Sequence, residues 1–227
     1  MTILGIETST AVCSVGLANE FNLRAEKSIT ETHIHSEKLL TLVQELCDEQ
    51  NMKLSQLDGV AVSIGPGSFT GLRIGLSTAK GLCFALEKPL SAVSTFASIA
   101  KSVTLSHPEY ARIIVCIDAK QREYYIGVYE QNSGTVREVL AVRIGSLPSA
   151  LAAVCAKTAI VTDRTGEVKA GSGGSFIVED VLSYCRGDVI ARMAIESWNS
   201  GKNNFWKQLE PMYLKDFVVR AQMKLNK

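Results

Sequence analysis

The sequence predicts an α/β protein made of two similar halves. Each half opens with short apolar and β-branched runs in hairpin order, and then alternates strand-like runs with segments of helical periodicity. A polar break at residues 105–109 separates the halves. We therefore expect an N-terminal lobe over residues 1–104 and a C-terminal lobe, with a tail, over residues 105–227. A hydrophobic fraction of 46% supports a folded globular protein.

The first half predicts three strands followed by alternating helices and strands. Strands are expected at Ile3–Ile6, Cys13–Ala18, Phe21–Ser28, Leu57–Ile64 and Pro89–Val93. Helices are expected from His35 to about Gln50, from Gly71 to Glu87 and from Thr95 to Val103. Ser68 or Thr70 can cap the second of these helices, because a hydroxyl at that place accepts a hydrogen bond from an unpaired backbone N–H.

The second half predicts a similar order. Strands are expected at Arg112–Ile117, Tyr124–Tyr129, Val136–Val142 and Ala159–Thr162, and helices at Leu147–Ala156, Val178–Cys185 and Asp188–Ser200. Residues 163–175 are rich in Gly, Thr and Ser without periodicity, which predicts an exposed loop. Two halves of this kind describe the duplicated ribonuclease-H-like arrangement of actin, Hsp70 and sugar kinases, known as the ASKHA fold.

The charge balance and the cysteines exclude several classes of function. The chain has 24 basic and 23 acidic residues, and this net charge of +1 is too small for a surface that holds RNA on its own. Six widely spaced cysteines include no C-x-x-C pair, which disfavours a structural zinc site and indicates reduced thiols. No segment has the roughly 20 uninterrupted apolar residues of a membrane span. We expect a cytoplasmic protein that does not bind membranes.

The most informative stretch is the turn from Gly65 to Gly75, which joins a strand to a helix. Such a turn can present backbone N–H groups to an anion, but the Gly-Lys-Ser/Thr of a Walker A loop does not follow. Gly71, Gly75 and Thr78 share one helix face, although each helical glycine costs about 1 kcal/mol relative to alanine. We expect this face to receive a neighbouring element at close range, either from the chain's own core or from a partner.

Two acidic strand ends are candidates for a nucleotide site. Glu7 is followed by Thr8 and Ser9, which resembles the first phosphate motif of ASKHA ATPases, where an aspartate organises magnesium. Asp118 ends the matching strand of the second half. Glu7 is one methylene longer than aspartate, and Lys120 stands where a glycine is usual. We therefore expect a vestigial nucleotide site that does not hydrolyse ATP.

The remaining polar motifs carry weaker signals. His33 and His35 could hold a metal, but a helix start capped by Thr32 explains the segment equally well, and no third ligand is near in sequence. The glycines of residues 171–174 could imitate an adenosine loop, but no strand leads into them. No acid–base pair or nucleophile with its partners can be assembled. We expect neither a metal site nor a catalytic residue.

Five motifs together resemble the TsaB (YeaZ) family. They are Ile-Leu-Gly-Ile-Glu-Thr-Ser-Thr (3–10), His-Ser-Glu-Lys-Leu-Leu (35–40), Gly-Pro-Gly-Ser-Phe-Thr-Gly-Leu-Arg-Ile-Gly (65–75) with Ala-Lys-Gly-Leu (79–82), Asp-Ala-Lys (118–120) with Tyr124 and Tyr125, and Glu-Pro-Met-Tyr-Leu-Lys (210–215). The resemblance is dense in the first half and patchier over residues 140–207.

The resemblance implies a part in making the threonylcarbamoyl group on adenosine 37 of tRNA. TsaB-like proteins are the non-catalytic members of this system and pair with the catalytic homologue TsaD, while the ATPase TsaE joins the complex. We also expect a homodimer when the chain is alone and contact with tRNA only through the complex. We expect no cofactor for the chain alone, whereas binding of ATP or ADP at the level of the complex stays open. Where TsaD has two histidine metal ligands, this sequence has His35 and the apolar Leu39.

In the family, the helices that correspond to residues 35–49 and 71–87 form the dimer surface. For this chain we infer that particular side chains on both helices make the partner interface. They are His35, Leu39, Leu42, Val43, Leu46, Gly71, Leu72, Gly75, Thr78 and Ala79.

Two alternative functions stay open from the sequence alone. The first is an ATPase or sugar-kinase-like phosphotransferase that uses Glu7 and Asp118. The second is a metallopeptidase, because the family is also classified with glycoproteases, and it predicts a bound metal.

Overall fold

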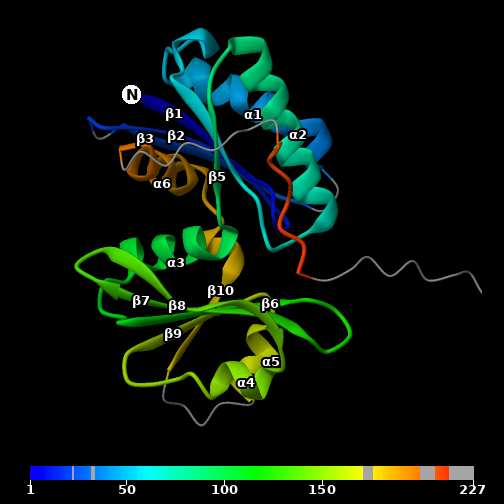
Figure 1. The fold of residues 1–227 in the computed structure, drawn as a ribbon, viewed down its shortest axis with the longest axis vertical. Coiled ribbons are helices and arrows are strands. Elements are labelled where there is room, and N and C mark those ends of the chain that lie inside the picture. Colours follow the sequence, from blue (N-terminus) through cyan, green and yellow to red (C-terminus); the bar gives the residue numbers. More distant parts are fainter. Residues whose placement is uncertain (22, 32–33, 171–175, 200–207, 215–227) are drawn as a thin grey trace, which may run out of the picture.

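In a computed structural model, the described strands form two five-stranded sheets that lie one above the other along the long axis (Figure 1). The structure describes residues 1–21, 23–31, 34–170, 176–199 and 208–214. Within these residues, no helix is long and apolar enough to cross a membrane.

The first sheet has the order β3-β2-β1-β4-β5. Its strands are β1 (Thr2–Glu7), β2 (Val12–Asn19), β3 (Arg24–Thr30), β4 (Gly59–Ser63) and β5 (Leu90–Val93). The first three are consecutive and antiparallel, whereas β4 and β5 run parallel to β1. This order brings the carboxyl ends of β1 and β4 to the same edge of the sheet, where loops can build a site.

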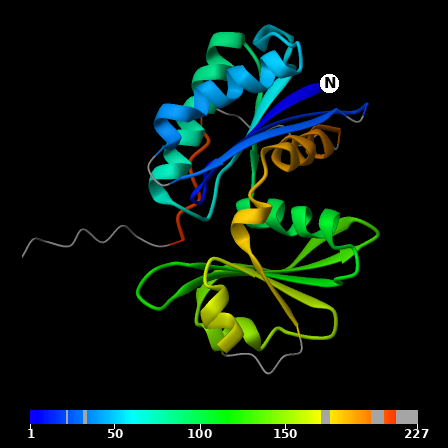
Figure 2. The ribbon, with the colours of Figure 1, turned by 180° about the vertical axis from the view of Figure 1, so that it is seen from behind.

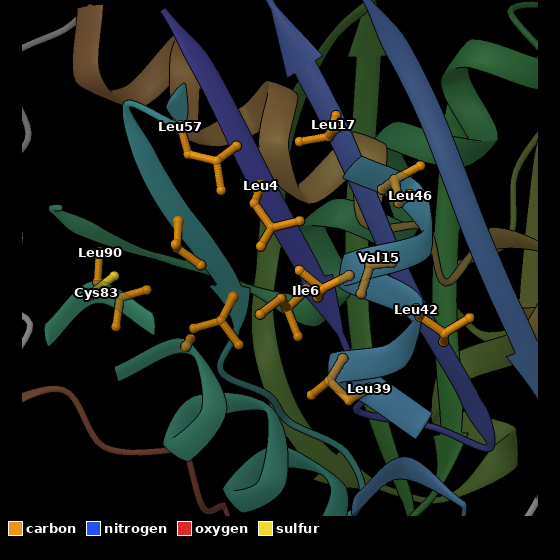
Figure 3. Packing of buried hydrophobic residues seen from close by; sticks show 14 of the residues in the cluster. Leu4, Ile6, Val15, Leu17, Leu39, Leu42, Leu46, Leu57, Cys83 and Leu90 are labelled. Atoms are coloured by element: carbon orange, nitrogen blue, oxygen red, sulfur yellow. The ribbon is translucent and has the colours of Figure 1, made fainter. Parts of the chain in front are cut away.

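Two helices, α1 (His35–Glu49) and α2 (Phe69–Leu86), cover one face of this sheet. A short 3₁₀ helix, η1 (Leu54–Gln56), precedes β4. Leu39, Leu42 and Leu46 recur at helical spacing on α1 and point into the strands, as Figure 3 shows. They meet alternate residues of β1 and β2, including Leu4 and Ile6, so helical and strand periodicities bury one common apolar core.

The second sheet has the order β10-β9-β6-β7-β8 and repeats the pattern of the first. Its strands are β6 (Arg112–Asp118), β7 (Tyr124–Asn132), β8 (Thr135–Gly145), β9 (Thr158–Thr162) and β10 (Ile177–Asp180). The first three are antiparallel and the last two run parallel to β6. Helices α4 (Leu147–Leu151) and α5 (Thr165–Ala170) cover its outer face. The expected duplicated α/β fold is confirmed.

Two helices cross between the sheets and tie the lobes together. Helix α3 (Thr95–Ser106) follows β5 but packs on the second sheet, where Phe96 and Ile99 join its core. Helix α6 (Gly187–Asn199) belongs to the second half of the chain but packs on the first sheet. Figures 1 and 2 show both helices between the two sheets. A boundary between residues 104 and 105 therefore assigns every strand to its own sheet. It does not assign the helices in this way, because α3 and α6 each pack on the sheet of the other half.

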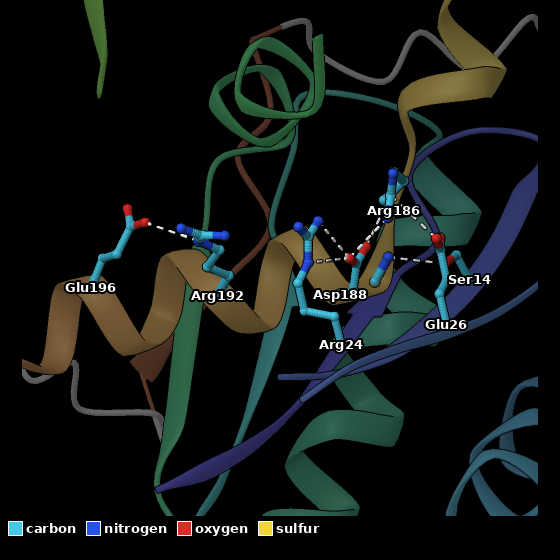
Figure 4. A network of polar contacts seen from close by, with 8 residues as sticks. Ser14, Arg24, Glu26, Arg186, Asp188, Arg192 and Glu196 are labelled. Atoms are coloured by element: carbon cyan, nitrogen blue, oxygen red, sulfur yellow. Dashed lines mark hydrogen bonds and ion pairs between the residues drawn. The ribbon is translucent and has the colours of Figure 1, made fainter. Parts of the chain in front are cut away.

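Glycines and a charge network fix the start of α6 on the first sheet. A Cβ at Gly16 would lie 2.0 Å from the Asp188 nitrogen, so the helix touches the strand backbone. Asp188 is buried and accepts hydrogen bonds from Arg24 and Arg186, at 3.1 and 2.9 Å from their Nη2 atoms. Figure 4 shows that Glu26 lies beside them, 3.2 Å from Arg186. Each buried charge in this contact has a partner of opposite sign.

Three elements of the second half differ from the sequence expectation. Part of the expected loop at residues 163–175 forms α5, whose Val168 packs under the sheet. The expected helix at residues 178–185 is strand β10 followed by a 3₁₀ helix, η2 (Val181–Tyr184). Helix α4 ends at Leu151, five residues earlier than expected. Residues 178–185 and 147–156 are apolar runs too short for periodicity to define the type or the end of the element. Residues 165–170 contain Val168 as their single large apolar side chain, which is too few for periodicity to indicate a helix.

Candidate functional site

A cleft of about 940 Å³ lies between the lobes, at the carboxyl ends of β1 and β6. The first lobe lines it with the loop after β1 and with the turn before α2, including Ser9, Gly67 and Ser68. The second lobe contributes Asp118 and the turn after it. Of the two acidic strand ends that the sequence indicated, Asp118 lines the cleft itself. Glu7 does not line it, but the loop that follows Glu7 does, at Ser9 and Thr10.

Glu7 lies at the end of β1, and its side chain is fully buried. Its Oε1 accepts a hydrogen bond from the backbone nitrogen of Ser9 at 2.6 Å. Its Oε2 is also buried and has no hydrogen-bond partner among the described residues. Burial raises the pKa of Glu7, and hydrogen bonds from Ser9 only partly offset that rise. A carboxyl group in this setting closes its own loop and is not exposed for a hydrated magnesium ion.

The glycine face of α2 receives the loop after β1. The Thr8 hydroxyl donates to the Gly71 carbonyl at 2.8 Å. A Cβ at Gly71 would lie 2.0 Å from the Thr8 carbonyl oxygen, and one at Gly75 would lie 2.2 Å from the Thr8 hydroxyl. These two glycines are therefore required by close approach within the chain, which was one of the two explanations that the sequence left open.

The turn before α2 is closed in the same way. The Ser68 nitrogen donates to the Ser9 carbonyl at 2.7 Å, and the Ser68 hydroxyl accepts from the Gly71 nitrogen at 3.2 Å. Ser68 is thus the helix cap, as the sequence suggested. Because the chain itself uses these donors, the helix start is a poorer anion site than its glycine content indicates.

Asp118, at the end of β6, is held by two cations of its own lobe. Its Oδ2 lies 2.6 Å from Arg164 and 3.0 Å from Lys120. Burial alone would raise the pKa of Asp118, but the hydrogen bonds from Arg164 and Lys120 outweigh this effect and lower it to about 2. Lys120 has φ of 68°, a left-handed conformation that glycine adopts more easily. Arg164 is 46 residues away from Asp118 along the chain, so no local pattern indicated this pair.

The histidine segment forms part of the fold. His35 is buried, and its Nε2 lies 3.1 Å from the Thr10 carbonyl and 3.2 Å from that of Val12. It therefore ties the start of α1 to the loop after β1. Among the described residues, no group of three His, Cys, Asp or Glu side chains could hold a metal. Thr32, His33 and the glycines of residues 171–174 lie outside the described residues.

The structure corrects the expected interface at the level of side chains. Eight of the residues that we inferred to face a partner are buried within the first lobe, because they pack on its own strands and loops. They are Leu39, Leu42, Val43, Leu46, Gly71, Leu72, Gly75 and Ala79. His35 is buried as well, and Thr78 is half-buried.

The opposite faces of the same two helices are exposed. On α2, Ser77, Gly81 and Phe84 follow one another along the outer face. Phe84 is 77% exposed, and Leu40 on α1 is 58% exposed. A Cβ at Gly81 would meet no atom of the described residues within 4 Å, in contrast to one at Gly71 or Gly75. We call the residues Ser77, Gly81, Phe84 and Ala85 the outer stripe of α2.

A segment that is distant in sequence lies beside α2. Residues 208–214 are held there by two hydrogen bonds of 2.7 Å, from Lys80 Nζ to the Leu209 carbonyl and from the Met212 nitrogen to the Ile64 carbonyl. Figure 1 shows this segment, in red-orange, running alongside α2. Met212 and Tyr213 thereby become part of the cleft wall. The motif at residues 210–215 contributed to the family resemblance, but its spacing gave no signal for this position.

The fold and the cleft define a two-lobed protein of the ASKHA class. The component A of (R)-2-hydroxyglutaryl-CoA dehydratase from Acidaminococcus fermentans has the same fold, with a TM-score of 0.52 at 10% identity over 89% of this chain and 100% of that chain. Likeness at this level of identity concerns the fold alone.

More specific matches place the chain within this class. A family model described as "TsaD: tRNA N6-adenosine threonylcarbamoyltransferase" matches residues 25–160. The structure of YeaZ from Pseudomonas aeruginosa is similar with a TM-score of 0.81 and 28% identity, over 94% of this chain and 99% of that chain. The chain therefore belongs to the TsaB (YeaZ) family of TsaD-related proteins.

Two curated relatives carry the same name, "tRNA threonylcarbamoyladenosine biosynthesis protein TsaB". The one from Escherichia coli is 32% identical over 136 residues, which cover 60% of this chain and 58% of that protein. The one from Bacillus subtilis is 32% identical over 140 residues, which cover 62% of this chain and 60% of that protein. The matched region thus spans less than two thirds of the length of these relatives.

Proposed function

We propose that this chain is a non-catalytic subunit in the biosynthesis of N6-threonylcarbamoyladenosine at position 37 of tRNA. In this role it pairs with a TsaD homologue and activates it. The names of its TsaB relatives and the match to the TsaD family model support the proposal. The same family membership supports a cytoplasmic protein.

The observation that carries the proposal is that the two carboxylates at the cleft are held by groups of the chain itself. Glu7 is buried and bonded to Ser9, and Asp118 is paired with Arg164 and Lys120. An ATPase or sugar kinase needs carboxylates that can reach a metal ion and its bound water. The described residues do not fit ATP with magnesium, so phosphotransfer by this chain alone is not favoured. The chain needs no cofactor of its own, and ATP or ADP enters only in the complex.

We propose the outer stripe of α2, with Leu40 of α1, as the surface that pairs with TsaD. An exposed aromatic side chain beside small residues provides an anchor and room for a facing helix. The same surface serves a homodimer when the chain is alone, because a twofold interface uses one patch twice. TsaE joins the assembled pair, and tRNA contacts the complex. The net charge of +1 supports contact with tRNA through the complex, because it is too small for this chain to hold tRNA on its own.

Co-purification tests the proposal. The chain is expressed with the TsaD homologue from the same genome, and the complex is assayed with TsaE, ATP and tRNA for the modified adenosine. We expect a stable pair and modification that depends on both proteins. Modification at the full rate by the TsaD homologue and TsaE without this chain would contradict the proposal.

A further inference from the structure

Arg73 stands on the exposed side of α2, at the end of the helix that lies next to the cleft. Its guanidinium carbon lies 3.8 Å from the centre of the Phe69 ring and 5.7 Å from that of Tyr213. Its Nε donates a hydrogen bond to the Tyr213 hydroxyl at 2.9 Å. The two rings lie 4.9 Å apart and are tilted by 37°. The guanidinium group is therefore stacked and oriented before any partner arrives.

The outer edge of this guanidinium group is available. Among the described residues, its two terminal nitrogens have no hydrogen-bond partner, and no acidic side chain forms an ion pair with it. This differs from the other arginines that the structure orients, such as Arg164 and Arg186, which bind carboxylates of their own chain. A fixed pair of parallel N–H groups matches the two oxygens of one carboxylate.

The segment of residues 208–214 holds this platform in place. Its hydrogen bonds to Lys80 and to the Ile64 carbonyl leave Tyr213 against Phe69 and Arg73. Met212 and Tyr213 remain 40% and 42% exposed, so apolar surface flanks the cation. Arginine, tyrosine and methionine are enriched in protein–protein interfaces, and arginine and tyrosine often dominate their binding energy.

We infer that Arg73, Phe69 and Tyr213 form an anchoring site for a carboxylate side chain of the partner protein. This inference rests on the proposed function, because the site continues the outer stripe of α2: Arg73 precedes Ser77 by one helical turn, and Ser77 precedes Gly81 by another. The partner's aspartate or glutamate accepts two hydrogen bonds from the terminal nitrogens of Arg73. An apolar side chain beside it covers Met212 and Tyr213.

The surroundings favour a protein carboxylate over an RNA phosphate. Surfaces that hold a nucleic-acid backbone present several cations together. Here Lys80, two turns further along α2, donates to the Leu209 carbonyl, and the nearby Glu210 is acidic and exposed. One oriented arginine among apolar and small residues suits a single carboxylate in a protein interface.

The experiment measures the dissociation constant between the full chain and the TsaD homologue by calorimetry, at two salt concentrations. We expect Arg73→Gln to weaken binding by about tenfold or more and to reduce its salt dependence. Arg73→Lys keeps the charge but loses the parallel N–H pair, so we expect it to weaken binding as well. Tyr213→Phe should have a smaller effect, and Arg143→Gln, at an exposed position of the other lobe, should stay within twofold of the wild type.

Several results would overturn the inference. If Arg73→Gln binds within twofold of the wild type while Phe84→Glu abolishes binding, the carboxylate site is wrong and the proposed function stands. If the wild-type chain does not bind the TsaD homologue, the proposed function fails and the inference falls with it. If Arg73→Gln lowers only the affinity of the assembled complex for tRNA, the group bound is a phosphate. If it changes only self-association of the isolated chain, the occupant is a second copy.

Discussion

The inner and outer faces of α2 have opposite roles. On the inner face, Gly71 and Gly75 touch the loop after β1 so closely that a methyl group would collide with Thr8. On the outer face, no atom of the described residues lies within 4 Å of a Cβ placed at Gly81, and Phe84 is 77% exposed. The inner face is filled by the loop after β1, where it borders the cleft between the lobes. The described part of the chain leaves the outer face uncovered, so a functional surface of this helix is expected there.

The largest expected effect breaks the inner face. Gly71→Ala should lower the free energy of unfolding by about 3 kcal/mol, because its Cβ would lie 2.0 Å from a backbone oxygen that cannot move independently. Gly81→Ala is the matched control and should raise stability by about 0.5–1 kcal/mol, since alanine favours a helix and its Cβ would meet no atom of the described residues within 4 Å. Urea unfolding measures both. Equal stability of the two variants would contradict the difference between the faces.

The second prediction concerns the outer face. Phe84→Glu should change the free energy of unfolding by no more than about 0.5 kcal/mol, because the side chain is exposed. It should weaken binding to the TsaD homologue by about 2 kcal/mol or more, since it places a charge in an apolar interface. Chemical denaturation and calorimetry measure the two quantities. A variant that is strongly destabilised, or that binds like the wild type, would contradict this assignment.

The sequence alone predicted most of the fold but assigned the faces of α2 differently. The apolar positions of α1 and α2 recur at helical spacing, and periodicity identifies such a face without saying what covers it. Here the sheet of the same lobe covers Leu39 and the loop after β1 covers Gly75, which is why both residues are internal. Phe84 stands out only after the structure shows which face is left exposed.

Contacts between distant residues were beyond the sequence. Glu7 and Asp118 were recognised as strand ends, but the burial of Glu7 and the ion pair of Asp118 with Arg164 depend on tertiary packing. The packing of α3 and of α6 on the sheet of the other half also depends on tertiary contacts that no local pattern indicates. The segment of residues 208–214 has no periodicity, so its contact with α2 could not be deduced.

The third prediction tests the burial of Glu7 beside the cleft. Burial raises its pKa above the ordinary value of 4.5, so the folded chain binds a proton more tightly than the unfolded chain. Stability should therefore fall as the pH rises from about 4.5 towards the folded pKa. Glu7→Gln has no such proton and should gain stability relative to the wild type over this window. Unfolding at several pH values measures the difference in the free energy of unfolding between Glu7→Gln and the wild type. A difference that stays constant over this pH range would contradict a buried carboxyl group.

The smallest expected effect concerns Asp118. Its pKa is lowered to about 2 from 3.8, so the stability it contributes is present above pH 3.8 and is lost as the pH falls towards 2. Arg164 and Lys120 are 44% and 80% exposed, so solvent screens the pair. Asp118→Asn should cost only about 0.5 kcal/mol at pH 7. Denaturation of the wild type and of Asp118→Asn is compared at pH 7 and at pH 3. If the variant loses more stability relative to the wild type at pH 3 than at pH 7, the ion pair is contradicted.

The central claim is that the outer face of α2 carries the function and that the cleft carboxylates do not. The direct test is the content of threonylcarbamoyladenosine in tRNA, measured by mass spectrometry in cells whose own copy of this gene is replaced by variants. Cells with the Glu7→Gln and Asp118→Asn double variant should keep wild-type levels, whereas cells with Phe84→Glu should lose the modification. Loss of the modification with the double variant, while Phe84→Glu retains it, would contradict the claim.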